Sequence, residues 1–315
     1  MSKGVHRFAL LVAGATFFLI IAGANVTSHD AGLAVPDWPL AFGKFFPKMV
    51  GNVFWEHGHR LVAGVVLVLT VVLAIYLQVC ESRAWVKRLG WIALGGVFAQ
   101  ALLGGLTVKL NLPLAVSAAH ATLAQLFFLT TVSLAVFTSR GWIEPPVEVR
   151  EEGTGVSLRT LCVVALVAIL VQLVLGATLR HSATWDQPLP VALLLSHVGG
   201  AIIVTLVLGA TVATVLTRYR AENYLKRPAL AAAGLLFVQL ILGVTAYIVR
   251  AASPNDPQPL NPMISVTVAH VACGALVFAA TIVLTLRVFR ILRVERQAYA
   301  LATAWTPSAH GRGLG

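Results

Sequence analysis

Eight apolar runs, each long enough to cross a membrane, constrain this chain more than any other feature. A helix needs about 20 apolar residues to span the hydrocarbon core. Only 11% of the 315 residues are charged, whereas soluble domains carry about 25%. The sequence therefore predicts an all-α membrane protein with eight transmembrane helices. The predicted spans are 8–28, 55–79, 89–109, 114–138, 158–180, 190–216, 228–250 and 264–288.

The basic residues of the connecting segments predict the orientation. Most lysines and arginines outside the runs fall on the side that also holds both ends of the chain. Because basic loops stay on the cytoplasmic side, we expect both termini in the cytoplasm. We expect the protein itself in a prokaryotic-type cell membrane. The formal net charge of +11 is then a topology signal, and no nucleic-acid partner is expected.

A phrase that recurs in three spans indicates internal duplication. It is Q-x-x-x-G, at Gln100–Gly104, Gln172–Gly176 and Gln239–Gly243. Glutamine in a membrane helix tends to face a partner, and glycine allows close approach. We expect two pseudo-repeated four-helix bundles. The predicted parts are an N-terminal half (1–140), a cytoplasmic linker (141–157), a C-terminal half (158–290) and a cytoplasmic tail (291–315).

Four histidines lie close to the start of the even-numbered spans: His59, His120, His197 and His270. Since all even-numbered spans begin on the outer side, these imidazoles share one depth. Their spacing predicts one pair per half, His59 with His120 and His197 with His270. Paired imidazoles in a four-helix bundle suit the axial positions of a haem iron. A bare di-metal site needs several carboxylates, so haem is favoured.

The second span opens with Glu56-His57-Gly58-His59-Arg60. Glu56 and His59 are three residues apart and share a helix face, while His57 points elsewhere. Glu56 is either a proton-handling group close to a metal ligand or the structural ion-pair partner of Arg60. Both interpretations remain open. The basic side chains that end outer helix segments either contact haem carboxylates or reach to the interface; they are Lys109, Arg180 and Arg250.

Together these residues resemble the haem A synthase family over about residues 7–290. The resemblance rests on Glu56-x-x-His59-Arg60, the outer-loop phrase Gly32-Leu-Ala-Val-Pro36-Asp37-Trp38-Pro39-Leu40, and the three later histidines. It implies a haem-dependent oxidoreductase that converts the C8 methyl group of haem O to the formyl group of haem A for cytochrome oxidase biogenesis.

The resemblance also implies a ligand set and partners. His59 and His120 would hold the substrate haem, with Arg60 beside it, and His197 and His270 a haem b. Glu56 would be the catalytic acid, and we expect the loop with Trp38 to cap the substrate site. The implied partners are an electron donor, haem O synthase and cytochrome oxidase assembly proteins.

This chain departs from the family in its first outer loop. Many members carry a cysteine pair at about the places of Val35 and Ala41, and this sequence has neither. A disulfide or thiol relay there is therefore excluded. The alternative function is a di-haem b-type cytochrome that only relays electrons, for example from quinol. A repeat-built transporter is disfavoured because the spans lack mid-span Gly/Pro breaks.

Overall fold

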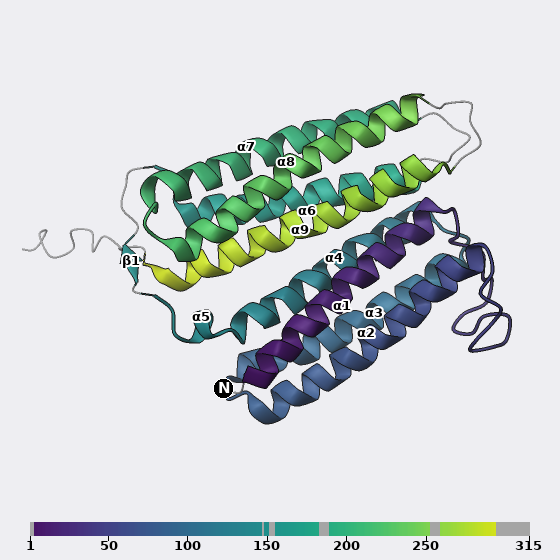
Figure 1. Cartoon of the computed structure of the whole chain (residues 1–315), viewed down its shortest axis with the longest axis horizontal. Coiled ribbons are helices and arrows are strands. Elements are labelled where there is room, and N and C mark those ends of the chain that lie inside the picture. Colours follow the sequence, from purple (N-terminus) through teal and green to yellow (C-terminus); the bar gives the residue numbers. More distant parts are fainter. Residues whose placement is uncertain (1–2, 147, 151–154, 183–188, 253–258, 294–315) are drawn as a thin grey trace, which may run out of the picture.

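The computed structural model describes residues 3–146, 148–150, 155–182, 189–252 and 259–293. In these ranges, eight helices are long and apolar enough to cross a membrane. Figure 1 shows how they are arranged. The predicted all-α membrane fold is confirmed. The helices are α1 (Lys3–Ser28), α2 (Asn52–Cys80), α3 (Ala84–Lys109), α4 (Leu114–Phe137), α6 (Leu158–Ser182), α7 (Val191–Arg218), α8 (Asn223–Ala252) and α9 (Asn261–Ile291).

The helices form two groups of four, α1–α4 and α6–α9 (Figure 1). In each group, consecutive helices pack as antiparallel hairpins, and the first packs on the fourth. Each group has its own apolar core, which includes Val12, Leu73 and Leu134 in the first and Cys162 and Leu208 in the second. The duplication itself stays a prediction, which this arrangement supports.

The two groups meet along α1, α4, α6 and α9. Ile20, Phe128 and Ala275 form a small buried apolar cluster there, from three different helices. Large apolar side chains elsewhere are exposed, such as Val72, Ile203 and Phe237. Exposed apolar faces of this extent fit a lipid environment.

Short elements that the sequence did not predict lie at the end where α1 begins and α9 ends. Helix α5 (Arg140–Ile143) starts after Ser139, whose hydroxyl accepts a hydrogen bond from the Trp142 amide. Strand β1 (Val149–Arg150) pairs in parallel with β2 (Leu292–Arg293). This pairing connects the predicted linker to the end of α9. Residues 294–315 of the predicted tail and residues 147 and 151–154 of the linker lie outside the described residues.

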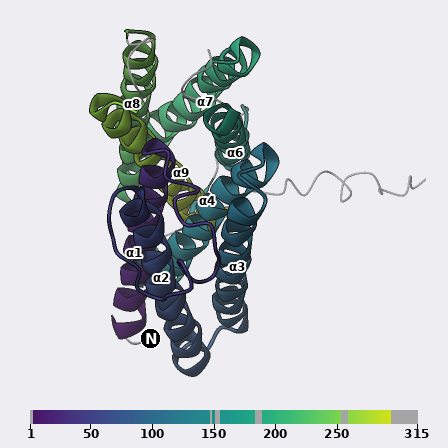
Figure 2. The ribbon, with the colours of Figure 1, turned by 90° about the vertical axis from the view of Figure 1, so that its right-hand side faces the viewer.

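The segment between α1 and α2, residues 29–51, lies at the opposite end of the molecule (Figure 1). Seen from that end, it crosses over α1, α2 and α3 (Figure 2). We call it the 29–51 loop. It carries the Pro36-Asp37-Trp38-Pro39-Leu40 phrase, so this phrase lies close to the starts of α2 and α4.

Candidate functional site

The four singled-out histidines lie on α2, α4, α7 and α9, all of which begin at the end that carries the 29–51 loop (Figure 1). His120 and His197 each follow the first residue of their helix by six positions, His59 by seven and His270 by nine. At about 1.5 Å per residue, the four side chains share roughly one depth. The structure thus brings the predicted residues to one end of the bundle.

Each of these histidine rings lies against a glycine of the preceding long helix. A Cβ atom built on Gly23 would lie 3.0 Å from Cε1 of His59, and one on Gly104 would lie 2.9 Å from Cε1 of His120. The distances are 2.9 Å from Gly176 to His197 and 3.1 Å from Gly243 to His270. Any larger residue would displace the ring, so these glycines set where each imidazole lies.

Three of the histidines also contact the glutamine one turn before that glycine. The Gln100 amide donates to the backbone carbonyl of His120 at 2.9 Å and lies 3.4 Å from its Nε2. The Gln172 amide donates to the His197 carbonyl at 2.9 Å and lies 3.0 Å from its Nδ1. Gln239 Nε2 lies 3.2 Å from Nε2 of His270. The glutamine and the glycine of each Q-x-x-x-G phrase therefore both contact a histidine of the next long helix.

Glycines that follow two of these histidines lie against glutamine side chains. Small residues next to a metal-binding histidine can leave room for a macrocycle, but Gly200 and Gly274 do not serve that purpose here. A Cβ on Gly200 would lie 2.1 Å from Gln172 Oε1, and one on Gly274 would lie 3.2 Å from Gln239 Nε2. These two glycines make room for the glutamines.

The histidine pairs have the geometry and chemistry of metal-ligand sites. The ring centroids of His197 and His270 are 6.4 Å apart. A metal–imidazole bond is about 2 Å and the ring centre lies about 1 Å beyond the nitrogen, so one metal holds opposed centroids about 6 Å apart. His59 and His120 lie within electrostatic range of each other. Among the described residues, Nδ1 of His59, His120 and His270 is buried and has no hydrogen-bond partner. Two imidazoles suit a haem iron in each pair, and for His197 and His270 the centroid separation suits it as well.

Glu56 and Arg60 attach the 29–51 loop to α2. One Glu56 carboxylate oxygen accepts from Arg60 Nη2 at 2.5 Å, and the other accepts from the Val35 amide at 2.7 Å. Arg60 donates in addition to the carbonyls of Asp37 at 2.7 Å, Leu40 at 3.1 Å and Val35 at 3.0 Å. Glu56 is only 4% exposed. The ion pair considered from the sequence exists, and Arg60 contacts loop carbonyls.

Other loop contacts surround this ion pair. His57 Nε2 donates to the Phe45 carbonyl at 2.9 Å, and the ring of His29 stacks on Trp55 with centroids 3.8 Å apart. The Trp38 indole lies against α3, where a Cβ on Gly105 would be 2.6 Å from Trp38 Cδ2. Since Gly105 follows the glycine under His120, Trp38 lies next to the first histidine pair.

Asp37 shapes the tip of this loop. Its two carboxylate oxygens accept from the Phe42 amide at 2.7 Å and the Gly43 amide at 2.8 Å. These backbone hydrogen bonds, that of Gly43 first, lower the pKa of the exposed Asp37 carboxyl below its ordinary value. Phe42 and Gly43 both have positive φ, 51° and 70°, and the Asp37 carboxylate holds this strained turn.

Two histidines that lie outside the predicted spans, His29 and His181, are partly buried in the structure. His181 belongs to α6 and lies within electrostatic range of His120 across the boundary between the helix groups. His29 is half-buried under Trp55. Helix α6 continues beyond its apolar run, which is why the run alone placed His181 in a loop.

A buried polar contact connects the two groups at the same end. Arg180 Nη2 donates to the Ser28 hydroxyl at 3.0 Å, and this hydroxyl lies 3.0 Å from that of Thr267. The three residues come from α6, α1 and α9. Sequence reasoning had considered Arg180 only as a haem or interface contact. Its hydrogen bond to Ser28 was not predictable, since serine near a helix end is common.

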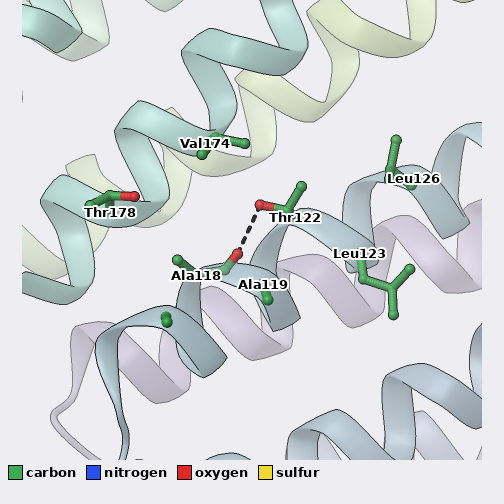
Figure 3. A pocket seen from close by; sticks show the side chains of 8 residues that line it. Ala118, Ala119, Thr122, Leu123, Leu126, Val174 and Thr178 are labelled. Carbon is green, nitrogen blue, oxygen red and sulfur yellow. Dashed lines mark hydrogen bonds between the residues drawn. The ribbon is translucent and has the colours of Figure 1, made fainter.

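An apolar pocket of about 500 Å³ lies between α4 and α6 (Figure 3). Its wall includes Ala118 and Ala119, which directly precede His120, and Val174 and Thr178 from α6. The Thr122 hydroxyl in this wall donates to the Ala118 carbonyl at 2.8 Å, so it offers the pocket little polarity. The small side chains beside His120 thus border open apolar space.

These features define a class of protein: a polytopic helical membrane protein with two histidine pairs at one end. A family model described as cytochrome oxidase assembly protein matches residues 48–185, which include the first histidine pair. The chain is 33% identical over 149 residues to the haem A synthase of Caulobacter vibrioides, covering 43% of this chain and 41% of that protein.

Two further relatives carry the same name. The haem A synthase of Oceanobacillus iheyensis is 32% identical over 128 residues, 39% of this chain and 41% of the relative. That of Symbiobacterium thermophilum is 30% identical over 187 residues, 57% and 60% of the two chains. The matches thus span about two fifths of the length of the first relatives. Part of the chain is thus similar to haem A synthases and to the cytochrome oxidase assembly family model.

Proposed function

We propose that this protein is a haem A synthase that oxidises the C8 methyl group of haem O to the formyl group of haem A. The observation that carries the proposal is the set of four helix-opening histidines at one end of the bundle, each seated on a glycine. The named relatives point to the same activity. In this proposal the histidine end faces the outer side of the cell membrane and both termini are cytoplasmic.

The two histidine pairs would bind different haems. His197 and His270 would hold a haem b permanently, which their 6.4 Å centroid separation supports. His59 and His120 would hold the substrate haem, because the 29–51 loop, with Trp38 beside α3, covers this half alone. When bound, haem supplies the redox chemistry that methyl oxidation requires.

The chain's own residues would position the substrate and move protons. The 29–51 loop, fixed by Glu56 and Arg60, would cover the first pair and limit access of water. Glu56 would accept or deliver protons at its carboxylate, and its buried hydrogen bonds to Arg60 and the Val35 amide hold that carboxylate in place. Arg60, which donates to three loop carbonyls and to Glu56, would act through the loop; its direct contact with the cofactor stays a prediction.

The proposed partners follow from this activity. The enzyme would receive haem O from a haem O synthase, deliver haem A to cytochrome oxidase assembly proteins, and take part in electron exchange with a separate carrier. The apolar pocket beside His120 gives the macrocycle or its substituents an apolar surface at the boundary between the two groups.

Identification of the bound haems tests the proposal. The full chain is produced in cells that supply haem O, purified, and its haems are extracted and identified by mass and absorption. We expect protohaem together with haem A or a hydroxylated haem O. Protohaem alone, with intact electron transfer, would instead support the di-haem cytochrome that only relays electrons.

A further inference from the structure

The glutamine support of the histidines is present at three positions and missing at the fourth. Gln100, Gln172 and Gln239 each lie four residues before the glycine that seats a histidine. On α1, the corresponding position before Gly23 is Leu19. A leucine side chain offers no hydrogen bond, whereas each of the other three rings has a glutamine amide nitrogen within 3.4 Å of a ring nitrogen.

We propose that the three glutamines are positioning residues that fix His120, His197 and His270 as metal ligands, and that Leu19 leaves His59 as the exchangeable ligand. This inference rests on the proposed function, in which the histidines hold haem. It assigns two fixed ligands to the C-terminal pair, and one fixed and one exchangeable ligand to the N-terminal pair.

The contacts explain how a glutamine fixes its histidine. Gln100 and Gln172 each donate to the backbone carbonyl of their histidine at 2.9 Å. This bond locks the amide group beside the ring. Partners of this kind set the orientation and tautomer of metal-bound histidines. The amide nitrogen of each glutamine faces a ring nitrogen of its histidine, at 3.0–3.4 Å. Among the described residues, Gln239 makes no bond to the His270 carbonyl and its Oε1 has no partner, so its amide can turn and accept a hydrogen bond from an imidazole N–H.

The neighbouring helices leave specific space for the glutamine side chains. The Gly200 backbone leaves space that Gln172 Oε1 fills, and the Gly274 backbone leaves space for the Gln239 amide. Gln100 is 9% exposed. Glutamine at such a depth in an apolar helix is costly without a partner, and the histidine is the partner in each case.

The asymmetry matches the different demands on the two pairs. A permanently bound haem gains from two ligands whose orientation is fixed in advance. A substrate haem has to enter and leave, and one ligand held only by packing against Gly23 lowers the cost of breaking its metal bond. Leu19 belongs to the apolar core of the first helix group, so the place is filled without a hydrogen bond.

Haem transfer to apomyoglobin, with protohaem as the probe, tests this inference on the full chain in detergent. The C-terminal pair is observed alone in a His59→Ala/His120→Ala background. There we expect Gln172→Leu and Gln239→Leu to weaken haem retention by about 10–100-fold, the usual effect of losing such a partner. Gln239→Glu keeps an acceptor oxygen and should restore retention with a lower midpoint potential.

A matched control separates this effect from loss of any buried glutamine. Gln125 on α4 is also buried, and its Oε1 is also unpartnered among the described residues, yet no hydrogen bond joins it to a histidine in the described chain. Gln125→Leu should leave haem retention unchanged. If it weakens retention as much as Gln239→Leu, or if neither does, the inference is wrong.

The reverse substitution tests the N-terminal pair. In a His197→Ala/His270→Ala background, Leu19→Gln should slow haem release by about tenfold or more, and a faster or unchanged release would overturn the proposal for His59. The parent chain serves as the reference for the proposed function. A parent that binds no haem would overturn both proposals, whereas a parent that binds haem with all glutamine variants unchanged would overturn this inference alone.

Discussion

At the scale of residues, the Glu56–Arg60 stretch contributes both to the attachment of the 29–51 loop and to the first histidine pair. Glu56, His57 and Arg60 bond to the 29–51 loop, and His59 packs inward on Gly23. Helical spacing predicted that His57 and His59 point apart. It could not predict that Arg60 binds loop carbonyls, because backbone acceptors carry no side-chain signature.

Glu56→Gln separates proton transfer from support of the loop. Arg60 keeps its three carbonyl acceptors in this variant, and glutamine can still accept from the Val35 amide. We therefore expect unchanged haem content, with haem A formation reduced by about 10²–10⁴-fold, the usual contribution of an acid–base group. Both quantities are measured on one preparation. Near-normal haem A formation would remove Glu56 from the mechanism.

The hydrogen bonds of the Asp37 carboxylate lead us to expect that acid releases the 29–51 loop. Because the folded-state pKa of Asp37 lies below the ordinary value of 3.8, its stabilising contribution is complete above that pH and is lost as the pH falls through the folded-state value. Trp38 fluorescence followed from pH 7 downward should report release of the loop below about pH 3.8. Asp37→Asn should abolish this transition, and an identical transition in that variant would assign it to other carboxyl groups.

At the scale of elements, the Q-x-x-x-G helices support histidines on their partners. The spans and the shared depth of the four histidines were predictable from the sequence, because hydrophobicity and position along each span determine them. The repeated phrase could be read directly. The sequence did not predict which glycines lie against a histidine ring, since small residues make room for a ligand and for helix packing alike. It also ended α6 too early, because a helix continues into the interface after its apolar residues end.

Two glycines of α8 give a matched test of the histidine seats. A Cβ at Gly243 would lie 3.1 Å from His270 Cε1, whereas one at Gly234 has no neighbour within 4 Å. Gly243→Ala should weaken haem retention at the C-terminal pair and destabilise the protein by about 1–3 kcal/mol through overpacking. Gly234→Ala should leave retention unchanged and be neutral or stabilising by up to about 1 kcal/mol. Thermal unfolding and haem content are measured for both. Equal effects would show that His270 does not depend on its glycine.

At the scale of the whole molecule, two helix groups present their histidine pairs at one end. They are connected there by the Arg180, Ser28 and Thr267 side chains and along the bundle by the cluster around Phe128. This arrangement fixes both pairs relative to each other, which the proposed electron exchange between two haems would require. The sequence predicted eight spans, an even number that puts both termini on one side. It did not predict the contacts between the two groups, because these contacts join residues far apart in the chain.

The haem content of four single variants tests the central claim most directly. His197→Ala or His270→Ala should remove the low-spin b-type spectrum of the purified protein, while His59→Ala or His120→Ala should retain that spectrum and lose haem A formation. Retention of full haem content and haem A formation in all four variants would contradict the assignment of the histidines as haem ligands.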